Sequence, residues 1–189
     1  MVADTKTKER IMEAARLTVQ DLGYSGLSFR ELAKDVGIKS ASIHYHFPTK
    51  GDLGAALARR YADDAMVYLD GLLAGSADLG TCIKSYIALF RAALLNDNRM
   101  CLYGIMAAER DDLPIEVRTE VDRFSEVNVR WLVKLLSQRK SAAGTGPLQQ
   151  QALAIFAAIE GAQLVARGRG DIAVFDKTIE AYRTAGLLP

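Results

Sequence analysis

The apolar residues of this chain follow a helical spacing throughout. Ile11, Ala15, Val19 and Leu22 recur at intervals of three or four residues, and Gly23 stands where a helix is expected to stop. Comparable stripes begin near residues 29, 40, 50, 79, 100, 114, 148 and 172, with a flexible connector at 141–147. No segment is convincing as a strand. The sequence therefore predicts an all-α fold of about nine helices.

Near the N-terminus the pattern predicts two short helices separated by a glycine. The first, Phe29–Val36, follows Ser28, which has the capping-box spacing to Glu31. Gly37 supplies the turn, and the second helix is predicted over Ser40–His46. Such a pair is typical of a helix-turn-helix, whose second helix enters the major groove of DNA.

The second of these helices has side chains suited to reading bases. Ile43 is the apolar residue expected to face the core, whereas Ser40, Ala41, Ser42 and His44 form a face of small and hydrogen-bonding groups. An alanine lets the backbone approach the bases, and its methyl group can contact a thymine methyl.

A long helix is predicted directly after this segment. Thr49 offers an N-cap with Asp52 three residues later, and an apolar stripe runs through Leu53, Leu57, Tyr61, Ala65, Tyr68 and Leu72. Lys50 lies in the first turn, where the helix N-terminus and the ammonium group could hold a phosphate together.

The overall charge at first argues against a nucleic-acid partner. The 189 residues include 24 Lys+Arg and 23 Asp+Glu, a net charge of +1, and 50% are hydrophobic. These values predict a folded chain and exclude a disordered one. However, the charge is unevenly distributed along the chain. Residues 1–60 hold ten basic and seven acidic residues, a net charge of +3. The remaining residues hold 14 basic and 16 acidic ones, a net charge of −2. The basic segment contains the predicted helix-turn-helix, where a polyanion would dock.

Other sequence features bear on the compartment. No run approaches the roughly 18 to 20 apolar residues that span a bilayer, and Met1–Arg10 is polar, so we expect neither a membrane span nor a secretory leader. Two cysteines favour free thiols in a reducing compartment. We therefore expect a cytoplasmic protein.

The N-terminal residues closely resemble the DNA-binding domain of TetR-family repressors. The resemblance rests on Gly23-Tyr24, Ser28–Ala33, Val36–Ile38 and Ser42–Lys50, and it runs over roughly residues 8 to 53. It implies a helix-turn-helix DNA-binding domain over residues 1–50 and an effector-binding and dimerisation domain over residues 51–189. It also implies three partners: double-stranded operator DNA, a small-molecule effector that is not identified, and a second copy in a homodimer. No cofactor and no membrane partner are implied.

The resemblance further implies roles for individual residues. Contacts to bases or to the DNA backbone are implied for Ser28, Arg30, Lys39, Ser40, Ala41, Ser42, His44, Tyr45, His46 and Lys50. Lys39 stands where the family often has the Ser or Thr that caps the recognition helix, so we expect that cap to pass to Ser40. His44 stands where tyrosine is common.

The resemblance also implies an effector cavity and a dimer interface in the body of the chain. The cavity residues would be Tyr86, Phe90, Met100, Cys101, Tyr103, Met106, Phe124, Asn128 and Trp131. The interface, formed by the last two helices, would contain Phe156, Gly161, Ala162, Leu164, Phe175, Ile179 and Tyr182. Ordinary core packing is the alternative for the cavity set, because ligand cavities and cores are both largely apolar.

Cys101 supports an alternative mode of regulation. It opens the segment Cys101–Glu109, which resembles a Cys-Leu-x-Gly-x-x-Ala-x-Glu segment in one branch of the family. A helix N-terminus and the nearby Arg99 would favour the thiolate, so the protein could sense electrophiles or oxidants. The alternative is a small buried hydrophobic residue, which is also how we interpret Cys82.

Two other classes of function fit less well. His44 and His46 are two residues apart and point to different sides of a helix, so we expect no metal site. The body contains no histidine, and the chain has no Gly-x-Ser-x-Gly and no phosphate loop, so we do not expect an enzyme. A helical interaction module that does not bind DNA is the third class. The sequence favours a DNA-binding transcriptional regulator, and more finely a repressor released from a palindromic operator by a small molecule.

Overall fold

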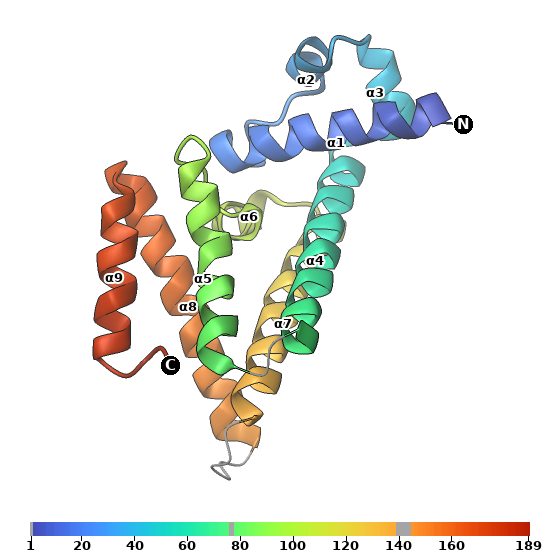
Figure 1. Ribbon diagram of the computed structural model, residues 1–189. Coiled ribbons are helices and arrows are strands. Elements are labelled where there is room, and N and C mark those ends of the chain that lie inside the picture. The colour runs from blue at the N-terminus through green and yellow to red at the C-terminus, as the bar shows by residue number, and fades with distance from the viewer. Residues whose placement is uncertain (1, 76–77, 139–144) are drawn as a thin grey trace. The chain divides into compact units, whose positions relative to one another are not determined.

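The computed structural model describes residues 2–75, 78–138 and 145–189 (Figure 1). Over these residues the chain forms nine α-helices and one short 3-10 helix, with no strand, which confirms the predicted all-α class. Residues 141–144 of the predicted connector lie outside the described ranges. No helix in the described part of the chain is long and apolar enough to cross a membrane.

The helices group into two compact units. The elements are α1 (Val2–Leu22), α2 (Phe29–Val36), α3 (Ser40–His46), α4 (Lys50–Gly75), α5 (Leu79–Leu95), α6 (Leu102–Ala108), the 3-10 helix η1 (Arg110–Asp112), α7 (Ile115–Ser137), α8 (Thr145–Arg169) and α9 (Ile172–Thr184). Unit 1 comprises residues 1–62 and 102–124, and unit 2 comprises residues 63–101 and 125–189. Unit 1 is larger than the predicted DNA-binding domain of residues 1–50, because α6 and the first part of α7 share its core.

The core of unit 1 joins the three N-terminal helices to α4, α6 and α7. Helix α1 packs against α2, α3 and α6, and α2 packs against α3. The buried side chains include Ile11 from α1, Leu32 from α2, Ile43 from α3, Leu53 from α4 and Met106 from α6. The short helices α2 and α3 cannot be stable in isolation, so these buried contacts hold them in place.

The helix boundaries in unit 1 partly follow the predicted caps. Thr49 and Asp52 form the expected reciprocal cap, since the Thr49 N–H donates to Asp52 Oδ2 and the Asp52 N–H donates to Thr49 Oγ1, each at 3.0 Å. Gly37 ends α2 in the left-handed conformation, with φ 71°. Ser28 is the N-cap residue of α2, but its side chain makes no capping hydrogen bond.

Two of the cap predictions are therefore wrong in detail. Glu31 does not complete a capping box, because its carboxylate bonds to Lys34 Nζ at 2.9 Å. The cap of α3 does not pass to Ser40, because Lys39 is the N-cap residue and Ser40 already lies inside the helix. The predicted apolar stripe of α4 also drifts, since Tyr68 is exposed and the adjacent Leu69 is buried. A period of 3.6 residues shifts the buried face over a helix of this length.

Unit 2 contains α5, α8 and α9 together with the second parts of α4 and α7. Helices α8 and α9 lie side by side, and α5 packs against both (Figure 1). Asp78 caps α5 by accepting a hydrogen bond from the Thr81 N–H, and Asp171 caps α9 as predicted by accepting one from the Ala173 N–H. Cys82 is buried in α5, as expected for a core residue.

Candidate functional site

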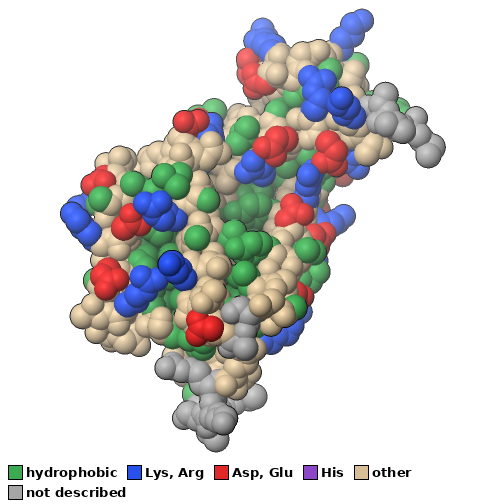
Figure 2. Space-filling model, in the orientation of Figure 1, with side chains coloured by type: hydrophobic (Ala, Val, Ile, Leu, Met, Phe, Trp, Pro, Cys, Tyr) green, Lys and Arg blue, Asp and Glu red, His purple; other side chains and the backbone are tan. Residues whose placement is uncertain are grey.

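Helices α2 and α3 of unit 1 present the candidate DNA-reading surface. Ile43 is completely buried and fixes α3 to the core, so the opposite side of this short helix faces outward. Ser40, Ala41 and His44 are exposed there, and Ser42 is half-buried. Lys and Arg side chains are spread over the part of the surface formed by α1–α3 (Figure 2).

The remaining predicted contacts in this region flank α3. Lys39 and Arg30 are exposed, and Ser28 is half-buried at the start of α2. Arg30 Nε lies 3.9 Å from the Glu31 carboxylate, a loose contact that leaves the guanidinium in solvent. These side chains precede α3 in the chain and are at least partly accessible to solvent.

The two aromatic residues at the end of α3 differ in their surroundings. Tyr45 is 75% exposed, which is unusual for so large an apolar ring and leaves it available to a partner. The side chain of His46 is nearly buried, with Nε2 3.5 Å from Asp4 Oδ1. His44 lies elsewhere, with its ring against Phe29. His44 and His46 therefore point to separate surroundings.

Lys50 occupies the first turn of α4, as predicted, but it is already engaged. Its ammonium group donates a hydrogen bond to the Ser25 carbonyl at 3.2 Å and lies 4.5 Å above the centre of the Tyr24 ring. Burial lowers the pKa of Lys50, and the nearby Glu109 carboxylate opposes this by favouring the charged form. The sequence pattern alone does not indicate the contribution of Glu109.

Unit 2 gathers six of the nine predicted cavity residues. Tyr86, Phe90, Met100, Cys101, Asn128 and Trp131 are all buried. The Tyr86 hydroxyl donates to Asn128 Oδ1 at 2.9 Å, and its ring lies 5.0 Å from that of Trp131. Trp131 Nε1 donates to the Leu69 carbonyl at 2.7 Å. The result is a mostly apolar cluster whose buried polar groups are paired by these two hydrogen bonds.

The other three predicted cavity residues lie in unit 1. Tyr103 and Phe124 stack with their ring centres 5.3 Å apart, and Tyr61 stacks on the same Phe124 at 5.0 Å. With Met106 they border a void of only about 10 Å³. A void of this size holds at most one water molecule, so this cluster has no room for an effector in the described conformation.

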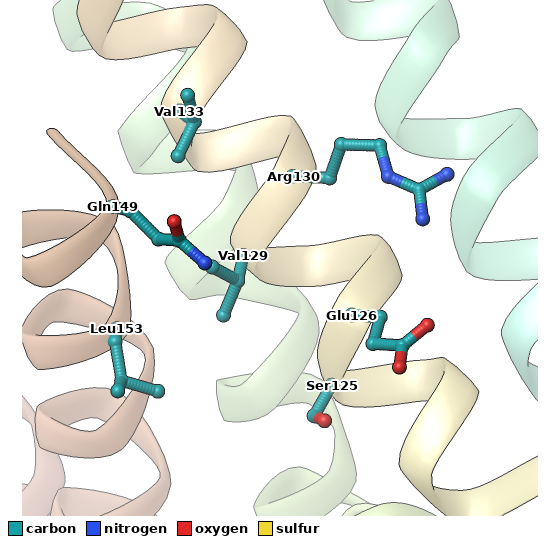
Figure 3. Close-up of a pocket in the computed structure, with 7 residues that line it drawn as sticks. All are labelled: Ser125, Glu126, Val129, Arg130, Val133, Gln149 and Leu153. Carbon is teal, nitrogen blue, oxygen red and sulfur yellow. The ribbon is translucent and has the colours of Figure 1, made fainter. Parts of the chain in front are cut away.

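A larger pocket opens in unit 2 between α7 and α8 (Figure 3). Its volume is about 570 Å³, within the range of small-molecule sites, and it is lined by Ser125, Glu126, Val129, Arg130, Val133, Gln149 and Leu153. Val129 and Val133 point toward the α8 side, whereas Arg130 points away from it (Figure 3). These residues occupy a different face of α7 from Asn128 and Trp131, and no sequence motif distinguishes them.

Cys101 has a different neighbour from the one expected. It is only 2% exposed, and its thiol donates to the Glu160 carboxylate, with Sγ 3.0 Å from Oε1. Burial raises the pKa of Glu160 to about 7, an effect that the Cys101 hydrogen bond partly offsets. Arg99 instead bonds to Asp97 and to Asn96. The side chain that the thiol contacts is thus acidic, and a carboxylate disfavours an adjacent thiolate.

The predicted interface residues fall into two groups. Phe156, Ala162, Phe175 and Ile179 are buried in the core of unit 2, whereas Gly161 and Tyr182 are half-buried and Leu164 is exposed. Within one chain the buried four serve to pack α8 and α9 against their neighbours. The large apolar side chains described as exposed on α8 are Leu153, Leu164 and Val165, and of these Leu164 belongs to the predicted set.

Comparisons with known proteins agree with the helix-turn-helix geometry. The family model described as "Bacterial regulatory proteins, tetR family" matches residues 11–57. The probable HTH-type transcriptional regulator YttP of Bacillus subtilis (strain 168) is 43% identical over 47 residues, which are 25% of this chain and 23% of that protein. That similarity therefore covers the N-terminal region only.

Solved structures extend the similarity to nearly the whole chain. A TetR transcriptional regulator from Legionella pneumophila is 29% identical, with a TM-score of 0.87 over 94% of this chain and 96% of that one. A TetR-family regulator from Agrobacterium tumefaciens is 28% identical, with a TM-score of 0.85 over 93% and 94% of the two chains. Residues 11–57 therefore match the DNA-binding segment of the TetR family, and nearly the whole chain is similar to transcriptional regulators of that family.

Proposed function

We propose that this protein is a DNA-binding transcriptional repressor that acts as a homodimer in the cytoplasm and leaves a pseudo-palindromic operator when a small molecule binds. The single observation that carries the DNA-binding part is the exposed face of α3, where Ser40, Ala41 and His44 are presented by a helix that Ile43 anchors in the core. Small and hydrogen-bonding side chains on such a helix are suited to the major groove.

In this proposal Lys50 binds phosphate and His44 reads bases. We expect Lys50→Ala to weaken binding to every duplex by a similar factor and to lower the slope of log affinity against log salt by about 1, because one phosphate contact is lost. His44→Ala should instead change which sequence is preferred. The measurement is selection of duplexes from a random library, followed by titration at several salt concentrations.

The same titration provides the control for these two variants. Equal losses on the selected and on a random duplex for His44→Ala would contradict its role in base reading. A failure of the wild-type chain to enrich any duplex would favour the third class, a helical interaction module.

For the homodimer, the exposed apolar side chains of α8 provide support. Leu153, Leu164 and Val165 leave apolar side chains exposed on a helix of unit 2, and a Cβ added at Gly161 would meet no described atom within 4 Å beyond its chain neighbours and its own helix backbone. A small residue beside exposed apolar side chains suits the close approach of another helix. A selected operator with two half-sites should therefore bind two chains, and a single half-site should bind much more weakly.

The effector would bind in unit 2. The pocket between α7 and α8 has the volume of a drug-sized ligand, and the buried Tyr86–Asn128 pair could orient a polar group if the adjacent cluster opened. Effector binding would act by shifting the population of conformations that bind DNA.

Regulation through the Cys101 thiol is the alternative, and its surroundings give it less support. A thiol that is buried and donates to a carboxylate is poorly placed to react. We expect Cys101 to stay unmodified when the folded protein is treated with mild peroxide or N-ethylmaleimide, and to react after denaturation. Mass spectrometry measures this, and rapid labelling of Cys101 in the folded protein together with loss of DNA binding would support thiol sensing instead.

A further inference from the structure

We propose that Glu109 is a positioning residue for DNA recognition, whose carboxylate fixes the turn before the helix-turn-helix, to which the ammonium group of Lys50 is in turn bound. This inference rests on the proposed DNA-binding function. Glu109 lies directly after α6 and outside the DNA-binding segment matched by sequence, and all the contacts that follow are within unit 1.

The carboxylate of Glu109 binds the backbone of the α1–α2 turn. The Tyr24 N–H donates to Oε2 at 2.5 Å, and the Ser25 N–H is shared between the two oxygens at 3.3 and 3.4 Å. Hydrogen bonds from backbone N–H groups to a carboxylate are charge-assisted and stronger than neutral ones. One side chain directly after α6 therefore fixes two consecutive peptide groups some 85 residues earlier in the chain.

The turn is shaped to admit this carboxylate. Gly23 has φ +81°, a conformation that L-residues with a side chain rarely adopt, and a Cβ added there would lie 2.6 Å from Glu109 Oε1. Glycine at this position thus meets two requirements, the left-handed backbone and the close approach of Glu109.

Lys50 connects the same group to the other end of the helix-turn-helix. Its ammonium group bonds to the Ser25 carbonyl and lies over the Tyr24 ring, and the negative charge of Glu109 favours its protonated form. The turn precedes α2 and Lys50 begins α4, so the turn that Glu109 holds is also the contact point for the residue that follows α2 and α3.

The start of α7 holds the first turns of α4 in the same region. A Cβ added at Gly54 would lie 2.6 Å from the Tyr24 ring and 3.0 Å from Val117, and one at Gly51 would overlap the Glu116 carboxylate. Helix α4 therefore packs closely on the α6–α7 corner. A displacement of α6 would change the geometry of the turn and of Lys50 together, which gives α6 a direct route to the DNA-reading surface.

The test is a comparison of Glu109→Gln with Glu120→Gln. Glu120 is a suitable control because it is a half-buried carboxylate of unit 1 that bonds to Arg59 at 2.8 Å, away from the turn. Each variant and the wild-type chain are titrated with a duplex selected from a random library, and the affinity is normalised to the active fraction. Stability in urea is measured in parallel.

We expect Glu109→Gln to bind the selected duplex about tenfold more weakly, within the range typical of coupling between sites, and to keep the salt slope because Lys50 is still present. Exchange of the Tyr24 and Ser25 amide hydrogens should accelerate. Unchanged affinity per active molecule would overturn the inference, as would an equal loss in Glu120→Gln. Tighter binding would also overturn it, because Glu109 would then compete with phosphate for Lys50.

A measurement on the wild-type chain keeps the inference testable even if the variant folds poorly. Coupling is reciprocal, so the selected duplex should slow amide exchange in α6 as well as in α3. Protection of α3 with unchanged exchange in α6 would overturn the role of Glu109 while leaving DNA binding intact. Absence of any duplex binding would instead refute the proposed function, and this inference with it.

Discussion

Replacing Ile43 by alanine should destabilise the protein by about 3 kcal/mol, the middle of the range for removing a large aliphatic side chain from a core. Ile43 is fully buried in the core cluster of unit 1, and it is the only residue of α3 described as buried. A helix of seven residues has too few hydrogen bonds to persist without such an anchor. We therefore expect α3 to lose its position, and DNA binding to fall with it.

Chemical denaturation monitored by circular dichroism would measure the loss. The matched control is Ile115→Ala, since Ile115 is the same residue type in the same unit but is 73% exposed. We expect the control to lie within about 0.5 kcal/mol of the wild type, as is usual for surface substitutions. A loss below 1 kcal/mol for Ile43→Ala would show that α3 is held by other contacts.

Glu160 should make the stability of the protein depend on pH. Burial raises the pKa of its carboxyl from 4.5 to about 7 in the folded chain. Between pH 4.5 and 7 the folded state keeps a proton that the unfolded state has lost, so stability falls as pH rises through this range. The stabilising contribution of Glu160 is therefore complete below pH 4.5 and is lost above pH 7. A difference of about 2.5 pKa units corresponds to about 3 kcal/mol.

Glu160→Gln isolates this contribution. The amide is neutral at every pH and can still accept the Cys101 hydrogen bond, so the variant should match the wild type near pH 4.5 and exceed its stability by about 3 kcal/mol at pH 8. Other carboxyl groups have a lowered pKa, such as Asp176 beside Arg91, and these make the protein more stable as pH rises. Both proteins contain these groups, so their effect cancels when the stability of the wild type is subtracted from that of Glu160→Gln. Glu180→Gln, an exposed carboxylate on α9, is the control. Parallel pH profiles for wild type and Glu160→Gln would contradict the raised pKa.

Local patterns predicted the helix-turn-helix almost completely. Both ends of α2 and of α3 agree with the sequence, as do the Gly37 turn and the reciprocal cap of Thr49 and Asp52. These features depend on residues within four positions of each other, so spacing alone reveals them. The cap predicted for Ser28 and Glu31 was wrong because Lys34, one helical turn further, competes for the Glu31 carboxylate.

The candidate effector residues were harder to predict. The aromatic residues of α5 and α7 were expected to gather, and Tyr86 does contact Trp131. The open pocket between α7 and α8, however, uses residues with no distinguishing type or spacing, such as Val129 and Gln149. Whether a half-apolar helix face lines a pocket or a packed core depends on which helix covers it, and periodicity carries no such information.

By itself, the sequence determined the all-helical class, the bounds of the candidate DNA-reading helix and the residues on its exposed face. Only the tertiary structure decided which distant groups meet. It placed Glu109 on the turn at Tyr24 and Ser25, and it placed Glu160 against Cys101 in the position where a basic neighbour was expected. Helix periodicity and caps arise from interactions between near neighbours in the chain. The charge that a buried group meets depends instead on how whole helices pack, and that is fixed only when the core forms.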